Sequence, residues 1–326
     1  MPLDIPPAAN GPLTTVLDGH RFLEAPRWHA GRIWVSDIYG HRVYSALPDG
    51  SDCRVEAEVP GHPSGTGFLP DGRLLFTLLG DNRVFRREES GELVLHAETP
   101  GEHGGLNDMV IDGQGRAFAG AVGFDLGRNE PFATGYLERI DPDGTVTTVA
   151  DGLWFPNGSV ITEDGRLLVA ESFGNRITAF DLEADGSLTN RRAFATFGEP
   201  PASHAITEFL PGLDVTPDGC CLDEEGALWV ADPEHHRVLR VLDNGTIGQM
   251  IATPLKPFAC ALGDAGRTLF LCVAPDSSYE RRAIAAEARL LATAVQPARA
   301  GTRPYAMRNA HVGRAKYALD SCHRPR

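Results

Sequence analysis

The sequence predicts an all-β fold, a six-bladed β-propeller closed by strands from the two ends of the chain. Two observations support this class. A glycine turn followed by a strand rich in β-branched and aromatic residues recurs six times, and helical periodicity is nearly absent. The glycines of the six copies, which lie 40 to 61 residues apart, are Gly31, Gly72, Gly115, Gly165, Gly226 and Gly266. Repeats of this length are typical of propellers, in which each repeat is one four-stranded blade.

Each repeat contains the same elements in the same order. A first apolar strand, such as residues 159–161, ends at a turn of the Asp/Glu-x-Gly type, and the second strand follows its glycine. Another polar turn precedes a third strand, as in residues 236–239, and a more polar fourth strand completes the blade. The exception is residues 280–291, which we expect to begin as a helical turn.

The chain ends define the expected domain limits. Residues 13–17 and 289–295 flank the six repeats, so we expect them to pair in one blade and remove the open edges of the ring. Residues 1–12 form an N-terminal extension, and residues 13–298 form the six-bladed catalytic domain. Residues 299–326 form a basic tail, for which disorder is one interpretation. The longest insertion, residues 191–213, is expected to overhang the central site as a substrate lid.

Composition restricts the expected partners. The net charge of −14 opposes binding to nucleic acid or to anionic membranes, and no apolar stretch approaches the roughly 20 residues that a bilayer requires. The N-terminus lacks the pattern of a secretory signal, and the six cysteines contain no Cys-x-x-Cys spacing. We therefore expect a cytoplasmic protein with buried, reduced thiols, a monomer or small homo-oligomer that acts on a small molecule.

Oxygen-bearing side chains occur at one fixed phase of the repeat. The residues seven or eight positions before the six glycines are Glu24, Gly65, Asn107, Asn157, Asp218 and Ala259. Because equivalent positions in a propeller project towards the same axis, the four side chains with oxygen atoms should converge there. One such residue alone would more simply cap a turn, but four at one phase favour a metal site. Two carboxylates and two amides suit a hard cation such as Ca²⁺ or Mg²⁺.

Four segments that carry this phase resemble the blade-entry motifs of the regucalcin/gluconolactonase family of six-bladed propellers, which includes diisopropyl-fluorophosphatases and drug-responsive lactonases. They are Glu24–Trp28, Leu106–Asp112, Phe155–Gly158 and Pro217–Asp223, and the resemblance covers about residues 13–297. It implies that Glu24, Asn157 and Asp218 are direct ligands of one divalent cation. It also implies that Asn107 is a fourth ligand or holds a metal-bound water or the substrate. Ca²⁺ is favoured, with Mg²⁺, Mn²⁺ and Zn²⁺ as alternatives.

The resemblance also implies an activity, the metal-dependent opening of a lactone ring to a hydroxy acid. Asp218 would serve as the general base or the nucleophile. The alternatives are hydrolysis of a phosphotriester or fluorophosphate at the same site, and a calcium-binding or ligand-binding propeller without turnover.

One position departs from the family pattern. Vertebrate-type gluconolactonases carry an arginine two residues before the asparagine of blade 3, where this chain has Gly105. The loss of this cationic contact, together with Phe155 and Phe258, favours a more apolar lactone over a sugar lactone. Phe155, Phe258 and His204 of the insertion are therefore candidate substrate-binding residues, together with Asn107.

Other polar residues that repeat in phase have a simpler interpretation. His235 and His236 match the turn phase of the other repeats, and Asp37, Glu171 and Asp232 recur at the ends of second strands. Backbone-bonding turn residues explain all five, so they are not assigned to the site.

Overall fold

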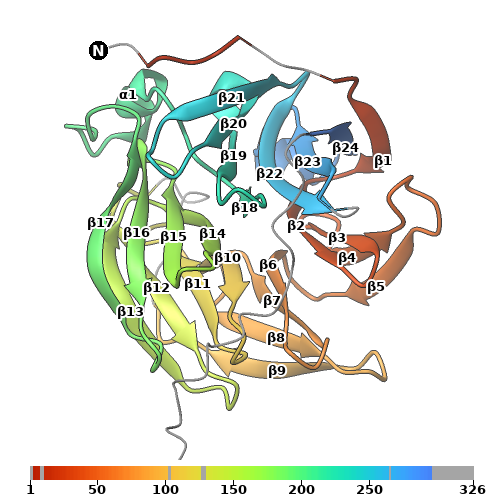
Figure 1. The fold of residues 1–326 in the computed structure, drawn as a ribbon. Coiled ribbons are helices and arrows are strands. Elements are labelled where there is room, and N and C mark those ends of the chain that lie inside the picture. The colour runs from red at the N-terminus through yellow and green to blue at the C-terminus, as the bar shows by residue number, and fades with distance from the viewer. Residues whose placement is uncertain (1–2, 8–10, 102–103, 126–129, 264–265, 296–326) are drawn as a thin grey trace, which may run out of the picture.

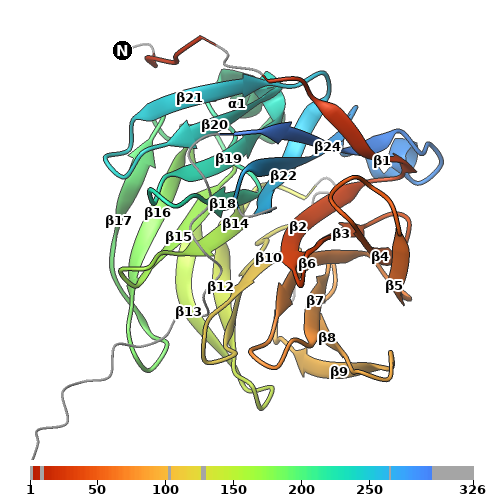
Figure 2. The same cartoon turned by 45° about the vertical axis from the view of Figure 1, so that its right-hand side comes forward.

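The predicted six-bladed propeller is confirmed by the computed structural model, which describes residues 3–7, 11–101, 104–125, 130–263 and 266–295. Over these residues the chain forms six four-stranded antiparallel sheets, arranged around a central axis as the blades of a ring (Figure 1). The first strand of each blade is innermost, so six inner strands surround the axis (Figures 1 and 2).

The first three blades follow the chain without interruption. Blade 1 contains β2 (Leu23–His29), β3 (Arg32–Asp37), β4 (Arg42–Ala46) and β5 (Arg54–Glu58). Blade 2 contains β6 (Pro63–Phe68), β7 (Leu74–Leu78), β8 (Arg83–Arg87) and β9 (Leu93–Glu98). Blade 3 contains β10 (Leu106–Ile111), β11 (Ala117–Ala121), β12 (Gly135–Ile140) and β13 (Val146–Leu153).

The last three blades complete the ring. Blade 4 contains β14 (Pro156–Ile161), β15 (Arg166–Glu171), β16 (Arg176–Leu182) and β17 (Leu188–Thr196). Blade 5 contains β18 (Cys220–Leu222), β19 (Leu228–Asp232), β20 (Arg237–Val241) and β21 (Ile247–Ala252). Blade 6 contains β22 (Lys256–Gly263), β23 (Thr268–Ala274), β24 (Ala288–Ala294) and β1 (Thr14–His20).

Closure of the ring occurs in blade 6, as the sequence predicts. β1 pairs antiparallel with β24, with Thr14 opposite Ala292 and Thr15 opposite Leu291. The N-terminal strand is therefore the outermost strand of blade 6, whose other three strands come from the C-terminal part of the propeller. The predicted tail, residues 299–326, lies outside the described residues.

The helical elements are short: α1 (Ile206–Phe209), η1 (Leu210–Gly212), η2 (Pro233–His235) and α2 (Tyr279–Arg282). The helical turn predicted from residue 280 corresponds to α2, but the chain becomes extended again at Ala288, where β24 begins. No helix in the described part of the chain is both long and apolar enough to cross a membrane.

The core lies between the blades, because each second strand is buried on both faces. In β7, Leu75 packs with Met109 and Ala119 of blade 3, while Phe76 packs with Val43 of blade 1 on the other side. Successive side chains of a strand point to opposite faces, so one apolar strand contributes to two inter-blade clusters. This explains why the residues after each repeat glycine are apolar without alternation.

Candidate metal centre

The four predicted donors lie at the same end of the propeller. Glu24, Asn107 and Asn157 are each the second residue of an inner strand, and Asp218 precedes the inner strand β18 by two residues. At this point the pairing of inner and second strands is irregular, with register shifts between Glu24 and Arg27 in β2, between Leu106 and Met109 in β10, and between Pro156 and Ser159 in β14. Such irregularities re-aim side chains, which here places the donors at the mouth of the central channel.

Steric crowding explains why blade 2 contributes no donor, whereas blade 6 has Ala259 at the equivalent position. A Cβ atom on Gly65 would lie 2.6 Å from the carbonyl oxygen of Asn107 and 2.7 Å from the amide nitrogen of Met109. In blade 6, the side chain of Ala259 fills the position where a Cβ on Gly219 would lie, at 2.4 Å. The neighbouring inner strand is therefore too close for a side chain at position 65, and the absence of a side chain at position 219 lets Ala259 approach the chain next to Asp218.

The amide of Asn157 is oriented by a serine of the same blade. Its Nδ2 donates a hydrogen bond of 3.2 Å to Oγ of Ser172, and this hydroxyl donates in turn to the carbonyl oxygen of Pro217 at 2.8 Å. Pro217 directly precedes Asp218. A single buried hydroxyl thus positions donors from blades 4 and 5 relative to each other.

Asn107 is held in a similar way by blade 2. The Oγ atom of Ser64 donates to its Oδ1 at 3.4 Å, and Oγ1 of Thr77 donates to its carbonyl oxygen at 2.6 Å. Sequence reasoning missed Ser64 and Ser172, because a lone serine outside a motif carries no distinguishing pattern.

The two carboxylates lack a cationic hydrogen-bond partner; Glu24 accepts only the backbone N–H of Ala25, at 2.9 Å, among the described residues. Asp218 is 9% exposed, and its Oδ1 is buried with no hydrogen-bond partner. Burial raises the pKa of Asp218 well above its usual range, and the negative charge of Glu24 raises it further. Burial also raises the pKa of the partly exposed Glu24 to about 8, with a further increase caused by Asp108. Two neighbouring carboxylates that repel each other, one with an orphaned oxygen, are the environment that a bound cation would stabilise.

A third carboxylate, Asp108, lies near this pair and forms an ion pair with Arg27. Its Oδ1 accepts a hydrogen bond of 2.8 Å from Nη2 of Arg27, which also donates to the carbonyl oxygen of Met109 at 2.8 Å. The Arg27 guanidinium lowers the pKa of Glu24, which opposes the effects of burial and of Asp108. Arg27 and Asp108 lie inside two of the segments that carried the family resemblance. In those two segments the repeat phase pointed to Glu24 and Asn107, so it missed Arg27 and Asp108.

The donor set fits a hard cation. It comprises two carboxylates and two amides, and no group of three or more His, Cys, Asp and Glu side chains in the described ranges could hold a metal ion. A soft, nitrogen- or sulfur-rich site of that kind would favour zinc or copper. The orphaned Oδ1 of Asp218 and the amide oxygens instead match the ligands that Ca²⁺ and Mg²⁺ take.

An aromatic cluster lies beside the donors of blades 3 and 4. Phe155 has a positive φ of 59°, and its ring lies 4.8 Å from that of Phe173 and 5.9 Å from that of Phe124. Phe155 precedes Asn157 by two residues and Phe173 follows Ser172, so the cluster adjoins the hydrogen-bonded asparagine. A positive φ in a bulky residue is strained and persists only where the surrounding structure imposes it.

The insertion that was predicted to be a lid differs from that prediction in two respects. The strand β17 continues to Thr196, so residues 191–196 belong to blade 4 and the insertion begins after them. The helix α1 then packs against the aromatic cluster, with the ring of Phe209 at 5.4 Å from that of Phe173. Figure 1 shows α1 outside the hub, near β17, so this helix supports one side of the mouth and does not cover the axis.

The two remaining substrate candidates lie in different surroundings. His204 is exposed, and its ring lies 5.8 Å from that of Trp154, on the same aromatic cluster. Phe258 is buried, with its ring 4.8 Å from that of Phe22, within the core between blades 6 and 1. Its position therefore matches a packing role.

Gly105 is packed against the loop that follows β7. Its φ is +67°, and a Cβ atom built on it would lie 2.4 Å from the amide nitrogen of Asp81 and 2.6 Å from the carbonyl carbon of Gly80. The chain reaches Asn107 by a path that leaves no room for a side chain on this backbone. The expectation that Gly105 marks a missing substrate contact stays a prediction.

The turn residues behave as the repeat predicts. His235 ends the short helix η2, and His236 takes a left-handed conformation directly after it. Asp232 accepts the backbone N–H of Thr216 at 3.0 Å, and Asp37 accepts that of Phe22 at 3.0 Å. These carboxylates tie blades 1 and 5 to the connections that enter their inner strands.

The fold defines the class of this protein as a six-bladed propeller, and the four predicted donors lie at one end of its inner strands. Residues 22–275 match the family model of the SMP-30/Gluconolactonase/LRE-like region, which shows that the chain belongs to this family. The chain is 33% identical over 265 residues to the pentonolactonase XacC of Haloferax volcanii, covering 77% of this chain and 81% of the relative.

Two further comparisons agree with this assignment. The chain is 26% identical over 265 residues to the 6-deoxy-6-sulfogluconolactonase of Pseudomonas putida, covering 79% of this chain and 84% of the relative. Its fold is similar to that of regucalcin, a calcium-binding protein from Agrobacterium tumefaciens, with a TM-score of 0.67 and 19% identity over 84% of this chain and 90% of the other. This last similarity concerns the fold alone.

Proposed function

We propose that this protein is a lactonase that opens a lactone ring to a hydroxy acid at the mouth of its central channel, with the help of one divalent cation. The observation that carries the proposal is Oδ1 of Asp218, which is buried without a hydrogen-bond partner. The pKa of the neighbouring Glu24 is raised as well. Similarity to two relatives named for sugar-lactone hydrolysis supports the reaction type.

Glu24, Asn157 and Asp218 would hold the cation, with Asn107 as a fourth ligand or as a contact to water or substrate. A Ca²⁺ ion bound there would polarise the lactone carbonyl and stabilise the negative charge that develops on its oxygen. Ser172 fixes the orientation of the Asn157 amide through their 3.2 Å hydrogen bond, and Ser64 does the same for Asn107. Preorganised donors of this kind lower the cost of reorganisation during the reaction.

Asp218 carries the proton transfer in this proposal. The carboxylate oxygen of Asp218 that does not hold the cation would accept the proton of an attacking water molecule, or would attack the carbonyl carbon itself. Phe155, which is partly exposed, would contact the carbon skeleton of the substrate, and the buried Phe173 and Phe124 would hold its ring in place and exclude water from that side. The ring-opened product is a hydroxy acid.

The substrate class is a sugar lactone of five or six carbons. This choice departs from the apolar preference expected from Gly105 and rests on the similarity to sugar lactonases. The two relatives named above are called a pentonolactonase and a sulfogluconolactonase.

A substrate panel tests the proposal. Pentono-1,4-lactones, glucono-δ-lactone, an unsubstituted aliphatic lactone and a phosphotriester are each assayed by proton release, with Ca²⁺ and with EDTA. We expect hydrolysis of a sugar lactone that EDTA abolishes and that Asp218→Asn lowers by about a thousandfold or more. Glu163→Gln, at an exposed turn of the opposite face, is the matched control. Turnover of the phosphotriester alone would favour the phosphotriester hydrolase. A folded protein that binds calcium but turns over none of the compounds would favour the propeller without turnover.

A further inference from the structure

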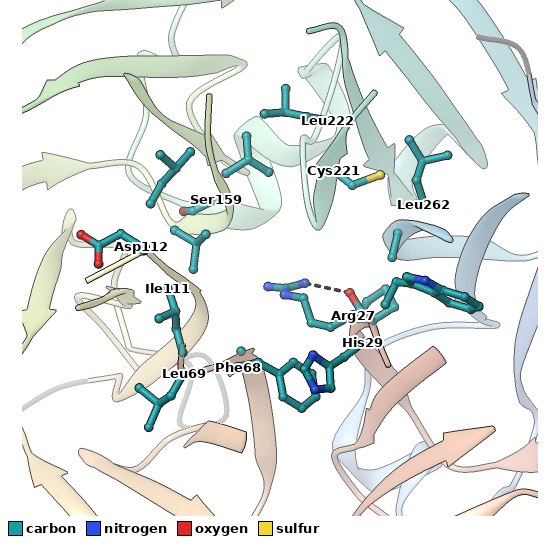
Figure 3. A pocket seen from close by; sticks show the side chains of 18 of the residues that line it. Arg27, His29, Phe68, Leu69, Ile111, Asp112, Ser159, Cys221, Leu222 and Leu262 are labelled. Carbon is teal, nitrogen blue, oxygen red and sulfur yellow. Dashed lines mark hydrogen bonds between the residues drawn. The ribbon is translucent and has the colours of Figure 1, made fainter. Parts of the chain in front are cut away.

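A second hollow lies at the opposite end of the channel from the candidate metal centre. It is a pocket of about 800 Å³, lined by the final residues of the inner strands and by the turns that follow them (Figure 3). His29 ends β2 and Ile161 ends β14, whereas Glu24 and Asn157 lie near the starts of the same strands. The pocket therefore opens on the other face of the ring.

One wall of this pocket carries a thiol with a close partner. Cys221, in β18 of blade 5, lines the pocket and is partly exposed (Figure 3). Its Sγ lies 3.9 Å from Sγ of Cys260, a fully buried residue in β22 of blade 6. The expectation that the strand cysteines are buried therefore holds for Cys220, Cys260 and Cys272 but not for Cys221.

The two strands are close enough to be joined at this point. The backbone N–H of Gly219 donates to the carbonyl oxygen of Phe258 at 2.9 Å, which links the inner strands of blades 5 and 6 directly beside the two thiols. A disulfide requires an S–S distance of about 2.05 Å, so the sulfur atoms must approach by about 2 Å, which side-chain rotation of a partly exposed cysteine can supply.

The other described cysteines have no such arrangement. Cys220 packs in the core between blades 4 and 5, and Cys272 packs in the core between blades 6 and 1. Cys53 is exposed on the outer part of blade 1. Among the described residues, only Cys221 combines access from a pocket with a neighbouring sulfur.

We propose that Cys221 and Cys260 form an oxidisable thiol pair, which a small disulfide entering the pocket converts into a covalent link between blades 5 and 6. The thiolate of Cys221 attacks one sulfur of the small disulfide, forms a mixed disulfide and releases one small thiol. Cys260 then attacks the Cys221 sulfur and releases the second small thiol, so that the protein loses two hydrogen atoms and two electrons, and the small disulfide gains them.

The surroundings of the two sulfur atoms determine this order of attack. Cys260 cannot be reached by a reagent, because it is fully buried and its Sγ lies 3.4 Å from the carbonyl oxygen of Trp229. Burial also raises the pKa of its thiol well above the usual range. Cys221 is therefore the entry point, and Cys260 is the residue that resolves the mixed disulfide.

The link would stabilise the ring without blocking the candidate metal centre. Cys221 follows Asp218 by three residues, but the pocket opens on the face opposite the donors. Joining two blades restricts the unfolded chain, so we expect the oxidised protein to melt about 5 °C higher than the reduced protein.

The test uses a Cys53→Ser, Cys322→Ser background, which retains Cys220, Cys221, Cys260 and Cys272. The protein is incubated with oxidised glutathione, and free thiols are counted after denaturation. We expect two of the four thiols to disappear, no glutathione to remain attached, and peptide mapping to find a Cys221–Cys260 link that dithiothreitol reverses.

Single variants in this background locate the pair. Cys221→Ser and Cys260→Ser should each prevent the loss of two thiols, whereas the matched neighbour Cys220→Ala should still show it. Mapping the disulfide in the unmutated protein gives the same answer without relying on any variant to fold. The proposal is overturned if all four thiols persist, if the mapped link contains Cys220 or Cys272, or if Cys221 keeps a stable glutathione adduct.

Discussion

Arg27 and Asp108 form an ion pair of 2.8 Å between Nη2 and Oδ1 that joins blade 1 to blade 3 and skips the blade between them in the ring. The side chain of Asp108 is 7% exposed and that of Arg27 is 21% exposed. The pair places an ion-paired carboxylate near Glu24 and Asp218, and the negative charge of this carboxylate raises the pKa of both. The Arg27 side chain also lines the pocket on the other face. One ion pair thus lies between the two ends of the channel.

Asp108→Asn is expected to destabilise the protein, because it leaves the Arg27 guanidinium partly buried without a counter-charge. The loss in the free energy of unfolding should be about 2 kcal/mol in calcium buffer, measured by urea denaturation. Arg27→Met combined with Asp108→Asn should recover part of it. The exposed pair of Arg42 and Glu58 is the control, where Glu58→Gln should change stability by less than about 0.5 kcal/mol. Equal effects of Asp108→Asn and Glu58→Gln would contradict this account.

The metal-free protein should lose stability as the pH rises. The pKa of Glu24 is raised from 4.5 to about 8 in the folded protein, so the folded state binds a proton that the unfolded state releases at lower pH. The free energy of unfolding therefore falls between about pH 4.5 and pH 8 in EDTA, by about 2–4 kcal/mol. Calcium, which favours the ionised carboxylates, should remove this fall. Thermal melts across this pH range measure both effects.

Glu24→Gln provides the complementary test of the same site. Without its carboxylate, the EDTA-treated variant should melt higher than the wild type at pH 8 and show a smaller dependence on pH. Its calcium affinity, measured by calorimetry, should fall by about a hundredfold or more. A variant that keeps calcium at wild-type affinity would show that Glu24 is not a ligand.

Ser172→Ala should weaken the cation site more than it weakens the fold. The substitution removes the hydroxyl that accepts from Asn157 and donates to the carbonyl of Pro217, so both donors lose their orientation. Calcium affinity is expected to fall by about 10- to 100-fold. Ser45→Ala is the control, because Ser45 is a buried serine in β4 whose Oγ donates a 2.6 Å hydrogen bond to Oε1 of Glu56, in the outer half of blade 1 where no ligand is predicted. If both variants lose affinity equally, Ser172 has no specific role.

Gly105→Ala is expected to be strongly destabilising, by about 3 kcal/mol or more. It combines an unfavourable positive φ with a Cβ that would lie 2.4 Å from the backbone nitrogen of Asp81. Gly80→Ala separates the two causes, because Gly80 also has a positive φ of +71° but has nothing within 4 Å of its Cβ position. That variant should lose only about 1 kcal/mol. A Gly105→Ala protein as stable as Gly80→Ala would mean that the loop has room for a side chain.

Much of this architecture could be predicted from the chain because the repeat is local. The glycine turns, the second strands and the phase of Glu24, Asn107, Asn157 and Asp218 are patterns within about ten residues, and each blade repeats them. Equivalent positions in a closed ring necessarily face the same axis, so the gathering of the four donors at one end follows from the repeat itself. The closure of the ring by β1 and β24 follows from the position of two strand-like segments outside the six repeats.

Other features depend on distances between residues that are remote in the sequence. The ion pair of Arg27 and Asp108 spans 81 residues, and the thiols of Cys221 and Cys260 lie in different blades. The sequence around Gly105 does not reveal in which direction a side chain at this position would point. Only the packing of Gly80 and Asp81 against it shows that a side chain is excluded.

The sequence by itself determined the number of blades, their order and the phase of the donors, because local periodicity fixes which residues turn and which face the axis. The tertiary structure alone decided which charges are paired, which oxygen of Asp218 lacks a partner and which cysteine can be reached from solvent. The physical reason is that burial and pairing are properties of the space between strands. That space is defined only when neighbouring blades, brought together from distant parts of the chain, pack against each other.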